Sequence, residues 1–438
     1  MTPEIESAVP EVLLPGLRLE GVRRSGRVRE AKGLILRSSL PEAHLGELVR
    51  IERDGEDLAA EVIGFDRHGA LLMPFSRLED VAAESRVIPE ESQPTIPAGD
   101  AVLGRVLDAL GQPLDGRGPL WGAEFAPLQT EPPPSLERRP ITEPIVTGRR
   151  ALDGLLTLGR GQRVSICAAA GAGKSTLLGQ LLRHIEADRI VLALIGERGR
   201  EVRQFLDHDL DGEARRRATV VVSTSDQSPL LRMRAAYAAT AIAESARARG
   251  ENVVLMMDSV TRFARALRDV GQALGEPIGK GGLPASLFLR LPQLFERAGN
   301  DAHGTLTAFY TVLAEDDALD DPIVEETISL LDGHILLSRK IAQRKRFPAV
   351  SILSSVSRLM AAVTGAEHQA LAQKAAELEA EHAANLDKIK MGLYETGNLD
   401  SEQIEERHQS LEEFLAQGPE PSGFDETLEA MSQRFGGW

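Results

Sequence analysis

A lysine and two hydroxyl side chains follow an apolar run at the spacing of a phosphate-binding loop. Residues 164–168 are apolar or small and predict a buried strand, and small residues then form a turn before a helix-like segment. Such a turn lets backbone N–H groups point at anionic oxygens, and a helix N-terminus also favours anions. The predicted nucleotide-binding residues of this loop are Ala169, Ala170, Gly171, Ala172, Gly173, Lys174, Ser175 and Thr176.

Mg²⁺ and the triphosphate of a nucleotide are the ligands that this loop predicts. Lys174 can reach the β- and γ-phosphates, and Ser175 offers a hydroxyl to Mg²⁺. Asp258 follows the apolar run 253–257, where a carboxylate could order a water on the metal, although Asp before a helix can also be a simple N-cap. Together these residues predict a site for ATP and Mg²⁺.

A second carboxylate follows another apolar run, at residues 190–195. Glu197 is the candidate to polarise the attacking water, and Arg198 and Arg200 lie beside it in the sequence. Ligands bind at the carboxyl edge of such strands in doubly wound folds. A solvated turn held by ion pairs is the alternative interpretation of this segment.

The elements that must position these residues change in kind along the chain. Short alternating apolar segments predict an all-β barrel over 26–92, and a proline-rich stretch at 131–134 follows it. Between 93 and 360, strand-length runs alternate with helical stretches, which indicates an α/β nucleotide-binding domain with a mainly parallel sheet. Residues 361–438 predict an α-helical domain, and residues 1–25 an N-terminal partner-binding segment.

Composition narrows the class of protein further. The 438 residues carry 66 acidic and 50 basic side chains, a net charge of −16, which argues against a chain whose main task is to coat nucleic acid. One cysteine, no secretory signal and no apolar run of membrane-spanning length predict a cytoplasmic protein. Residues 361–438 hold 16 acidic against five basic side chains, which favours contact with a basic partner.

With these elements in order, the sequence resembles the rotary ATPase superfamily, and within it the type III secretion and flagellar protein-export ATPases. The resemblance spans nearly the whole chain. Beyond the two loops above, it rests on five stretches, at 104–116, 141–148, 306–313, 331–339 and 355–358. Two places depart from the family pattern, namely 314–318, with Asp316 and Ala318 at changed positions, and 392–394, where Gly-Leu-Tyr replaces Gly-Glu-Tyr.

The resemblance implies roles for individual residues. Glu197 matches the catalytic carboxylate, Lys174 and Ser175 the phosphate-loop pair, and Asp258 the metal-shell aspartate, acting through water. Arg198 and Arg262 match two arginines near the phosphates. Arg358 matches the arginine finger that enters the neighbouring subunit's site, and Phe347 matches the aromatic residue that packs on adenine.

The resemblance also implies an assembly and a task. A homohexameric ring would hydrolyse ATP at its subunit interfaces, release export substrates from chaperones and deliver them unfolded to membrane proteins of an export gate. The expected partners are a stator or regulator at the N-terminal segment, a central stalk and chaperone–substrate complexes, with no nucleic acid. The ring would lie peripherally on the cytoplasmic face of the inner membrane, and the segments 275–284 and 424–428 favour an injectisome over a flagellum.

Three alternatives remain open at this point. A catalytic subunit of a rotary ATP synthase shares the fold, but residues 199–202 and the C-terminal sequence fit the export branch better. An RNA-translocating termination helicase shares the ring, but aromatic residues make up only 4% of this chain. A ring subunit that binds nucleotide without hydrolysing it is opposed by the presence of Lys174, Glu197, Asp258 and Arg358.

Overall fold

A computed structural model describes residues 24–91, 93–210, 212–314, 320–390 and 399–437, and the chain divides into two compact units, 1–92 and 93–438. Three features singled out in the sequence lie outside the described residues: most of the N-terminal partner segment, and the departures at 315–318 and 392–394. The finer domain boundaries given above stay predictions.

The first unit is a closed barrel of six antiparallel strands, in the order β1-β2-β5-β4-β3-β6. Side chains alternate between buried and partly exposed along β2 and β3, as strands with one face on a core require. The barrel predicted for this part of the chain is confirmed. Its strands are β1 (Gly26–Lys32), β2 (Ile35–Ser38), β3 (Leu48–Ile51), β4 (Leu58–Asp66), β5 (Gly69–Pro74) and β6 (Arg86–Glu91).

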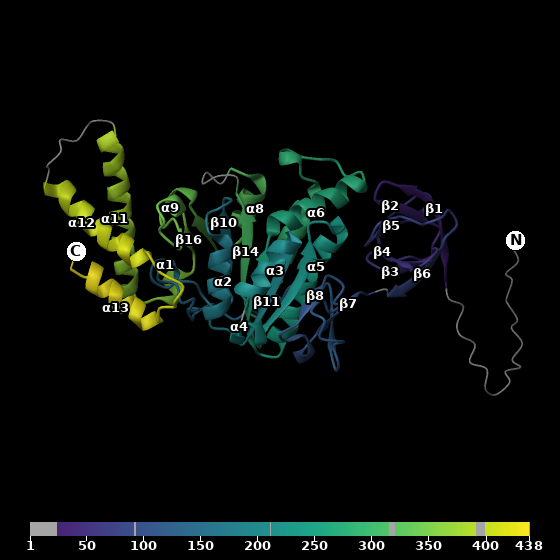
Figure 1. Ribbon diagram of the computed structural model, residues 1–438, viewed down its shortest axis with the longest axis horizontal. Coiled ribbons are helices and arrows are strands. Elements are labelled where there is room, and N and C mark those ends of the chain that lie inside the picture. The colour runs from purple at the N-terminus through teal and green to yellow at the C-terminus, as the bar shows by residue number, and fades with distance from the viewer. Residues whose placement is uncertain (1–23, 92, 211, 315–319, 391–398, 438) are drawn as a thin grey trace, which may run out of the picture. The chain divides into compact units, whose positions relative to one another are not determined.

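The second unit is built on an eight-stranded sheet in the order β16-β15-β10-β14-β13-β11-β12-β8 (Figure 1). All neighbours pair in parallel except β15 and β16, so the predicted mainly parallel α/β architecture is confirmed. The strands are β8 (Val106–Asp108), β10 (Arg163–Ala168), β11 (Arg189–Glu197), β12 (Ala218–Thr224), β13 (Asn252–Asp258), β14 (Thr305–Leu313), β15 (Gly333–Leu337) and β16 (Val356–Ser357). A separate antiparallel pair joins β7 (Thr95–Ala98) to β9 (Glu124–Pro127).

Helices pack on this sheet, and further helices make up the C-terminal region. The prediction that this region is helical is confirmed. They are α1 (Arg150–Leu155), α2 (Lys174–His184), α3 (Gly199–His208), α4 (Gly212–Arg216), α5 (Pro229–Ala248), α6 (Val260–Ala273), α7 (Ala285–Glu296), α8 (Pro322–Leu330), α9 (Arg339–Gln343), α10 (Met360–Val363), α11 (Ala366–Lys390), α12 (Leu399–Leu415) and α13 (Phe424–Phe435). Two short 3₁₀ turns are η1 (Asp100–Val102) and η2 (Lys280–Gly282). Among the described helices, none is both long and apolar enough to cross a membrane.

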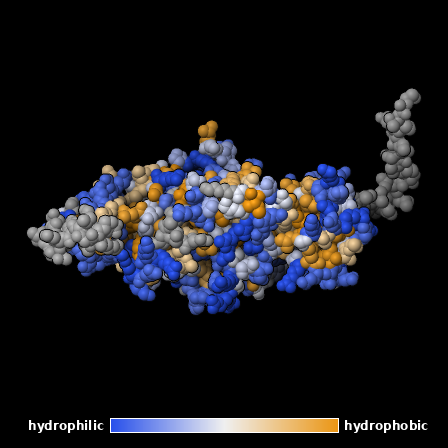
Figure 2. All heavy atoms as spheres, turned by 90° about the horizontal axis from the view of Figure 1, so that it is seen from above, coloured by the Kyte–Doolittle hydropathy of each residue, from blue (hydrophilic) through white to orange (hydrophobic). Residues whose placement is uncertain are grey.

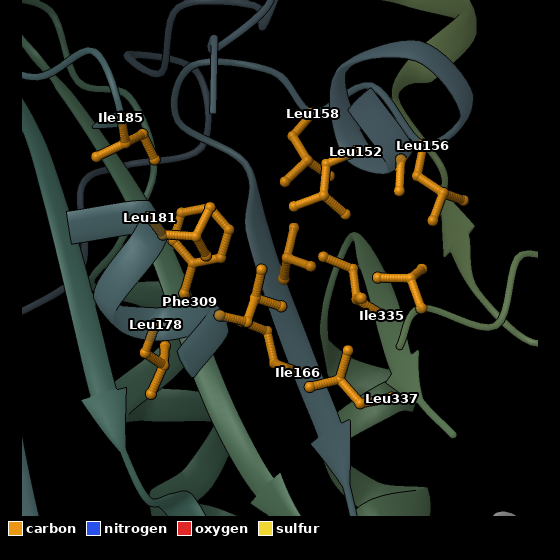
Figure 3. Packing of buried hydrophobic residues seen from close by; sticks show 14 of the residues in the cluster. Leu152, Leu156, Leu158, Ile166, Leu178, Leu181, Ile185, Phe309, Ile335 and Leu337 are labelled. Carbon is orange, nitrogen blue, oxygen red and sulfur yellow. The ribbon is translucent and has the colours of Figure 1, made fainter. Parts of the chain in front are cut away.

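One hydrophobic cluster joins the sheet to the C-terminal helices. Ile166 of β10 packs there with Leu181 of α2 and Phe309 of β14 (Figure 3). Phe414 and Met431, from α12 and α13, belong to the same cluster, and α1 contacts α11, α12 and α13. The C-terminal helices are therefore part of the core that supports the sheet. On the face shown in Figure 2, hydrophilic residues predominate and hydrophobic residues form separate groups between them.

Candidate active site

The phosphate-binding loop connects the end of β10 to the first residue of α2, Lys174. Gly171 and Gly173 have φ angles of 82° and 90°, in the left-handed region that glycine adopts without steric cost. Phe347 lies beside this loop, because a methyl group on Gly173 would be 3.5 Å from its Cε1. Phe347 is 39% exposed, so part of it is accessible to a ligand next to the loop.

The order of the parallel strands brings three charged residues together. The neighbouring strands β10, β14, β13 and β11 are parallel, so their carboxyl ends lie at the same edge of the sheet. Asp258 is the last residue of β13, and Glu197 is the last residue of β11. Lys174 Nζ forms an ion pair with Asp258 Oδ1 and lies 3.8 Å from Glu197 Oε1. The three residues predicted from separate segments therefore form one cluster at the mouth of the phosphate loop.

Glu197 is held in an environment that favours its protonated form. Burial, and secondly the negative charge of Asp258, raise its pKa to about 7, while the charges of Lys174 and Arg262 oppose this shift. A hydrogen bond with Glu201 raises the pKa further. A carboxyl group that titrates near neutral pH is suited to orient a water and to accept its proton.

A pocket of about 160 Å³ opens at this cluster, and Ser175, Glu197 and Asp258 all line it. Mg²⁺ prefers oxygen ligands and keeps several of its waters. The hydroxyl of the exposed Ser175 and the carboxylate of Asp258 supply such oxygens in the lining of one pocket, so the residues present fit a hydrated Mg²⁺.

The two predicted phosphate arginines differ in position. Arg262, in the first turn of α6, packs over Gly196, since a methyl group on that glycine would be 3.0 Å from Arg262 Cβ. Its Nε is buried with no hydrogen-bond partner among the described residues, so a donor remains available to an anion. Arg198 lies closer to solvent than the three clustered residues. Its side chain is 76% exposed and pairs with Glu201 at 3.3 Å.

Arg358 lies at the opposite edge of the sheet from the phosphate loop. Its backbone N–H donates to Asp332, just before β15, while the carboxyl end of β15 pairs with the end of β10 at Ala168. Five residues of extended chain separate these ends, which corresponds to roughly 16 Å. The Arg358 side chain is exposed, and within the described part of the chain its guanidinium has no ion pair or hydrogen bond. It cannot contact the phosphate loop of its own chain in this arrangement.

Two residues of the site were not identified from the sequence. Thr311 of β14 donates a 2.7 Å hydrogen bond from Oγ1 to Asp258 Oδ1, and Glu201 of α3 contacts Glu197 and lines the pocket. Glu201 is four residues after Glu197, a spacing that could have suggested the contact. For Thr311 the only signal was its place near the end of an apolar run.

Comparison with known proteins places this geometry in a family. Residues 148–357 match the ATP synthase alpha/beta family, nucleotide-binding domain, and residues 364–433 match the T3SS EscN ATPase C-terminal domain. The chain is 45% identical to a type 3 secretion system ATPase of Xanthomonas euvesicatoria over 94% of both chains. It is 42% identical to a flagellum-specific ATP synthase of Bacillus subtilis (strain 168), over 95% of this chain and 96% of that one.

A solved structure is similar over the same length. It shows the assembled ATPase EscN in complex with its central stalk EscO, from the enteropathogenic E. coli type III secretion system, with a TM-score of 0.86 and 40% identity over 94% of this chain and all of that chain. The phosphate loop, the carboxylates and the C-terminal helices all lie within the part of the chain that matches these relatives. This chain belongs to the type III secretion and flagellar export ATPases of the ATP synthase α/β family, and it is an ATPase.

Proposed function

We propose that this chain is an Mg²⁺-dependent ATP hydrolase that energises type III protein export as a homohexameric ring with active sites at its subunit interfaces. The observation that carries the proposal is the separation of Arg358 from Lys174 by the length of β15. A chain that cannot bring its own arginine to its phosphate loop needs a neighbour, and head-to-tail contacts that close give a ring.

In this proposal, each residue of the cluster has one task. The loop amides and Lys174 hold the β- and γ-phosphates, which replace the carboxylates that now surround the lysine. Glu197 orients the water and accepts its proton, and Arg262 and the neighbour's Arg358 offset charge that develops on the phosphoryl oxygens. Mg²⁺, held by Ser175 and through water by Asp258, would polarise the phosphoryl group. Phe347 would stack on adenine, and Arg198 would contact the phosphates only after turning from Glu201.

The partners are proposed from the relatives. The EscN structure with its central stalk supports a stalk contact for this ring, and the acidic C-terminal region supports a basic surface on that partner. We include a stator protein at residues 1–25, chaperone–substrate complexes and the membrane proteins of the export gate, with the ring peripheral on the cytoplasmic face of the inner membrane. An injectisome is the proposed setting, although relatives from both injectisomes and flagella match at similar identity.

A subunit-mixing experiment tests the shared active site. Lys174→Ala and Arg358→Ala should each abolish steady-state Mg-ATPase activity, since an arginine finger is worth about 10³–10⁵ in turnover. In rings assembled from equal amounts of both variants, about a quarter of interfaces combine an intact loop with an intact arginine, and activity should return to that extent. Arg203→Ala, at an exposed arginine paired with Asp207, is the matched control and should stay active.

The same experiment separates the competing functions. If activity fails to return on mixing while native mass measurements show mixed rings, the finger is not supplied in trans. If the unmodified protein binds ATP but does not turn it over at any concentration, with or without a stalk protein, a non-catalytic ring subunit is the correct class. The match of residues 364–433 to an export-ATPase C-terminal domain favours the export role over a rotary ATP synthase subunit.

A further inference from the structure

The residue proposed to stack on adenine is attached to helix α12 by its backbone. The carbonyl oxygen of Phe347 accepts a 2.8 Å hydrogen bond from the N–H of Gln417, two residues after α12 ends. Gln417 is itself fixed, because its Oε1 accepts from the N–H of Arg150 at 2.9 Å and its Nε2 donates to the carbonyl of Gly148 at 2.9 Å. This hydrogen bond therefore connects the loop at Phe347 to the end of α12.

The preceding residue makes a second connection to the same helix. Arg346 has a side chain that is only 5% exposed, and its Nε lies 3.3 Å from Glu412 Oε2 on α12. Its Nη2 donates to the carbonyl of Val350, while Nε and Nη1 are buried without a hydrogen-bond partner among the described residues, so the contact with Glu412 is an ion pair without a hydrogen bond. Burial lowers the pKa of Arg346. A buried guanidinium with so few hydrogen bonds depends on the carboxylates that neutralise it, and the charge of Glu412 supports that of Arg346 more than the charge of Glu379 does.

The surroundings of Glu412 also meet a distance criterion for a metal site. Ligand atoms of Glu379, His408 and Glu412 lie within 4.8 Å of one another. Contacts between protein side chains account for this cluster, however, since His408 Nε2 is 2.9 Å from Glu379 Oε2 and Arg346 Nε is 3.3 Å from the second carboxylate oxygen of Glu412. A divalent ion would sit next to the Arg346 guanidinium, so the cluster argues for a network of polar side chains and not for a metal.

We propose that Glu412 is a positioning residue for the nucleotide base: through its ion pair with Arg346 it fixes the loop that holds Phe347 beside the phosphate loop. This inference rests on the adenine-stacking role proposed for Phe347. Glu412 touches neither phosphate nor base, so its effect is confined to ligands that carry adenine. Glu412 thereby makes the C-terminal helical region a determinant of the affinity for the nucleotide base, whereas the loop after β10 binds the phosphates.

Binding measurements with and without a base test this role on the full chain. We compare Glu412→Gln with Glu413→Gln, the next residue of α12, whose side chain is 58% exposed and pairs with Arg434. Titration calorimetry gives the Kd of MgADP, and competition against ADP gives that of magnesium pyrophosphate, so hydrolysis does not interfere. We expect Glu412→Gln to weaken ADP by about threefold to tenfold, part of the cost of breaking a buried pair, and to leave pyrophosphate within about twofold.

Two further variants keep the test decisive. Glu412→Asp retains the carboxylate and should recover part of the ADP affinity. Arg346→Gln should weaken ADP to a similar extent, and the double variant should be no weaker than either single one if both act through one contact. Thermal melting on each sample shows whether the chain is folded.

Each other outcome overturns one specific claim. Equal weakening of ADP and pyrophosphate, or no change in either, would overturn the positioning role of Glu412. If Glu413→Gln has the same effect as Glu412→Gln, the ion pair with Arg346 is not the cause. If the unmodified protein binds ADP no more tightly than pyrophosphate, the stacking role of Phe347 is wrong, whatever Glu412 does.

Discussion

Thr311 Oγ1 donates a 2.7 Å hydrogen bond to Asp258 Oδ1, the same oxygen that pairs with Lys174. One oxygen of Asp258 therefore interacts with two donors, and the orientation of the Asp258 carboxylate in the pocket depends on the neighbouring strand β14. Thr311→Val removes the hydroxyl and keeps the shape. A hydrogen bond to a charged group contributes about 1.5–3 kcal/mol, so we expect kcat/KM for MgATP to fall by about tenfold or more.

A matched threonine on the same strand provides the control for Thr311. Thr307 is buried near the other end of β14, where its hydroxyl accepts a 2.8 Å hydrogen bond from the N–H of Gly161. Thr307→Val should lower stability without a comparable loss of turnover. Equal losses of turnover in the two variants would show that Thr311 supports the sheet and not the carboxylate.

Glu197→Gln should stabilise the protein at alkaline pH and inactivate it. The folded pKa of about 7 lies above the value of about 4.3 for an unfolded glutamate. Between these two pH values, the Glu197 carboxyl is mostly ionised in the unfolded chain and mostly protonated in the folded chain, so the wild type loses stability as pH rises towards 7. The glutamine of the variant does not titrate. We expect the stability gain of the variant to grow by about 1–2 kcal/mol from pH 5 to pH 8, allowing for solvent screening.

Two measurements check the role of Glu197. Urea unfolding at pH 5 and pH 8 gives the stability difference, and a gain that is identical at both values would contradict the raised pKa. Steady-state turnover should fall by about 10²–10⁴ if the carboxylate orients the water. For the wild type, kcat/KM should rise with pH through about 7, because only the ionised carboxylate accepts a proton.

Asp153→Ala should destabilise the second unit. Asp153 is buried and accepts hydrogen bonds from the N–H groups of Thr147 and Gly148 and from the Thr147 hydroxyl, at 2.9, 2.8 and 2.6 Å. The substitution leaves these donors without an acceptor, and we expect a loss of about 2–4 kcal/mol in the free energy of unfolding. Denaturant titration measures it, with Asp207→Ala, at an exposed ion pair, as a control expected to change little.

The individual elements could be predicted because buried parallel strands leave a continuous apolar signal. Residues 253–257 fall inside β13, and the polar residue that follows, Asp258, is the one that lines the pocket. The phosphate loop was predictable for a different reason, since its glycines, Lys174 and Ser175 act through local backbone geometry that spacing alone encodes.

Contacts between distant segments could not be predicted in the same way. Nothing in residues 306–313 indicates that β14 lies between β10 and β13, and that neighbourhood brings Thr311 to Asp258. Arg198 follows Glu197 directly, but its side chain is mostly exposed and pairs with Glu201 in the first turn of α3. The shared hydrophobic cluster that includes Phe414 likewise depends on how the C-terminal helices fold back onto α1.

The placement of Arg358 and Lys174 at opposite edges of one sheet has a genetic consequence. In the proposed closed ring, a chain that lacks Arg358 would still bind and hydrolyse nucleotide in its own site but would silence the site of the next subunit. Because the ring has six subunits, a minority of such chains expressed beside the normal protein would enter most rings and silence at least one site in each. We therefore expect Arg358→Ala to be dominant over the normal allele in export, whereas a variant that cannot join the ring should be recessive.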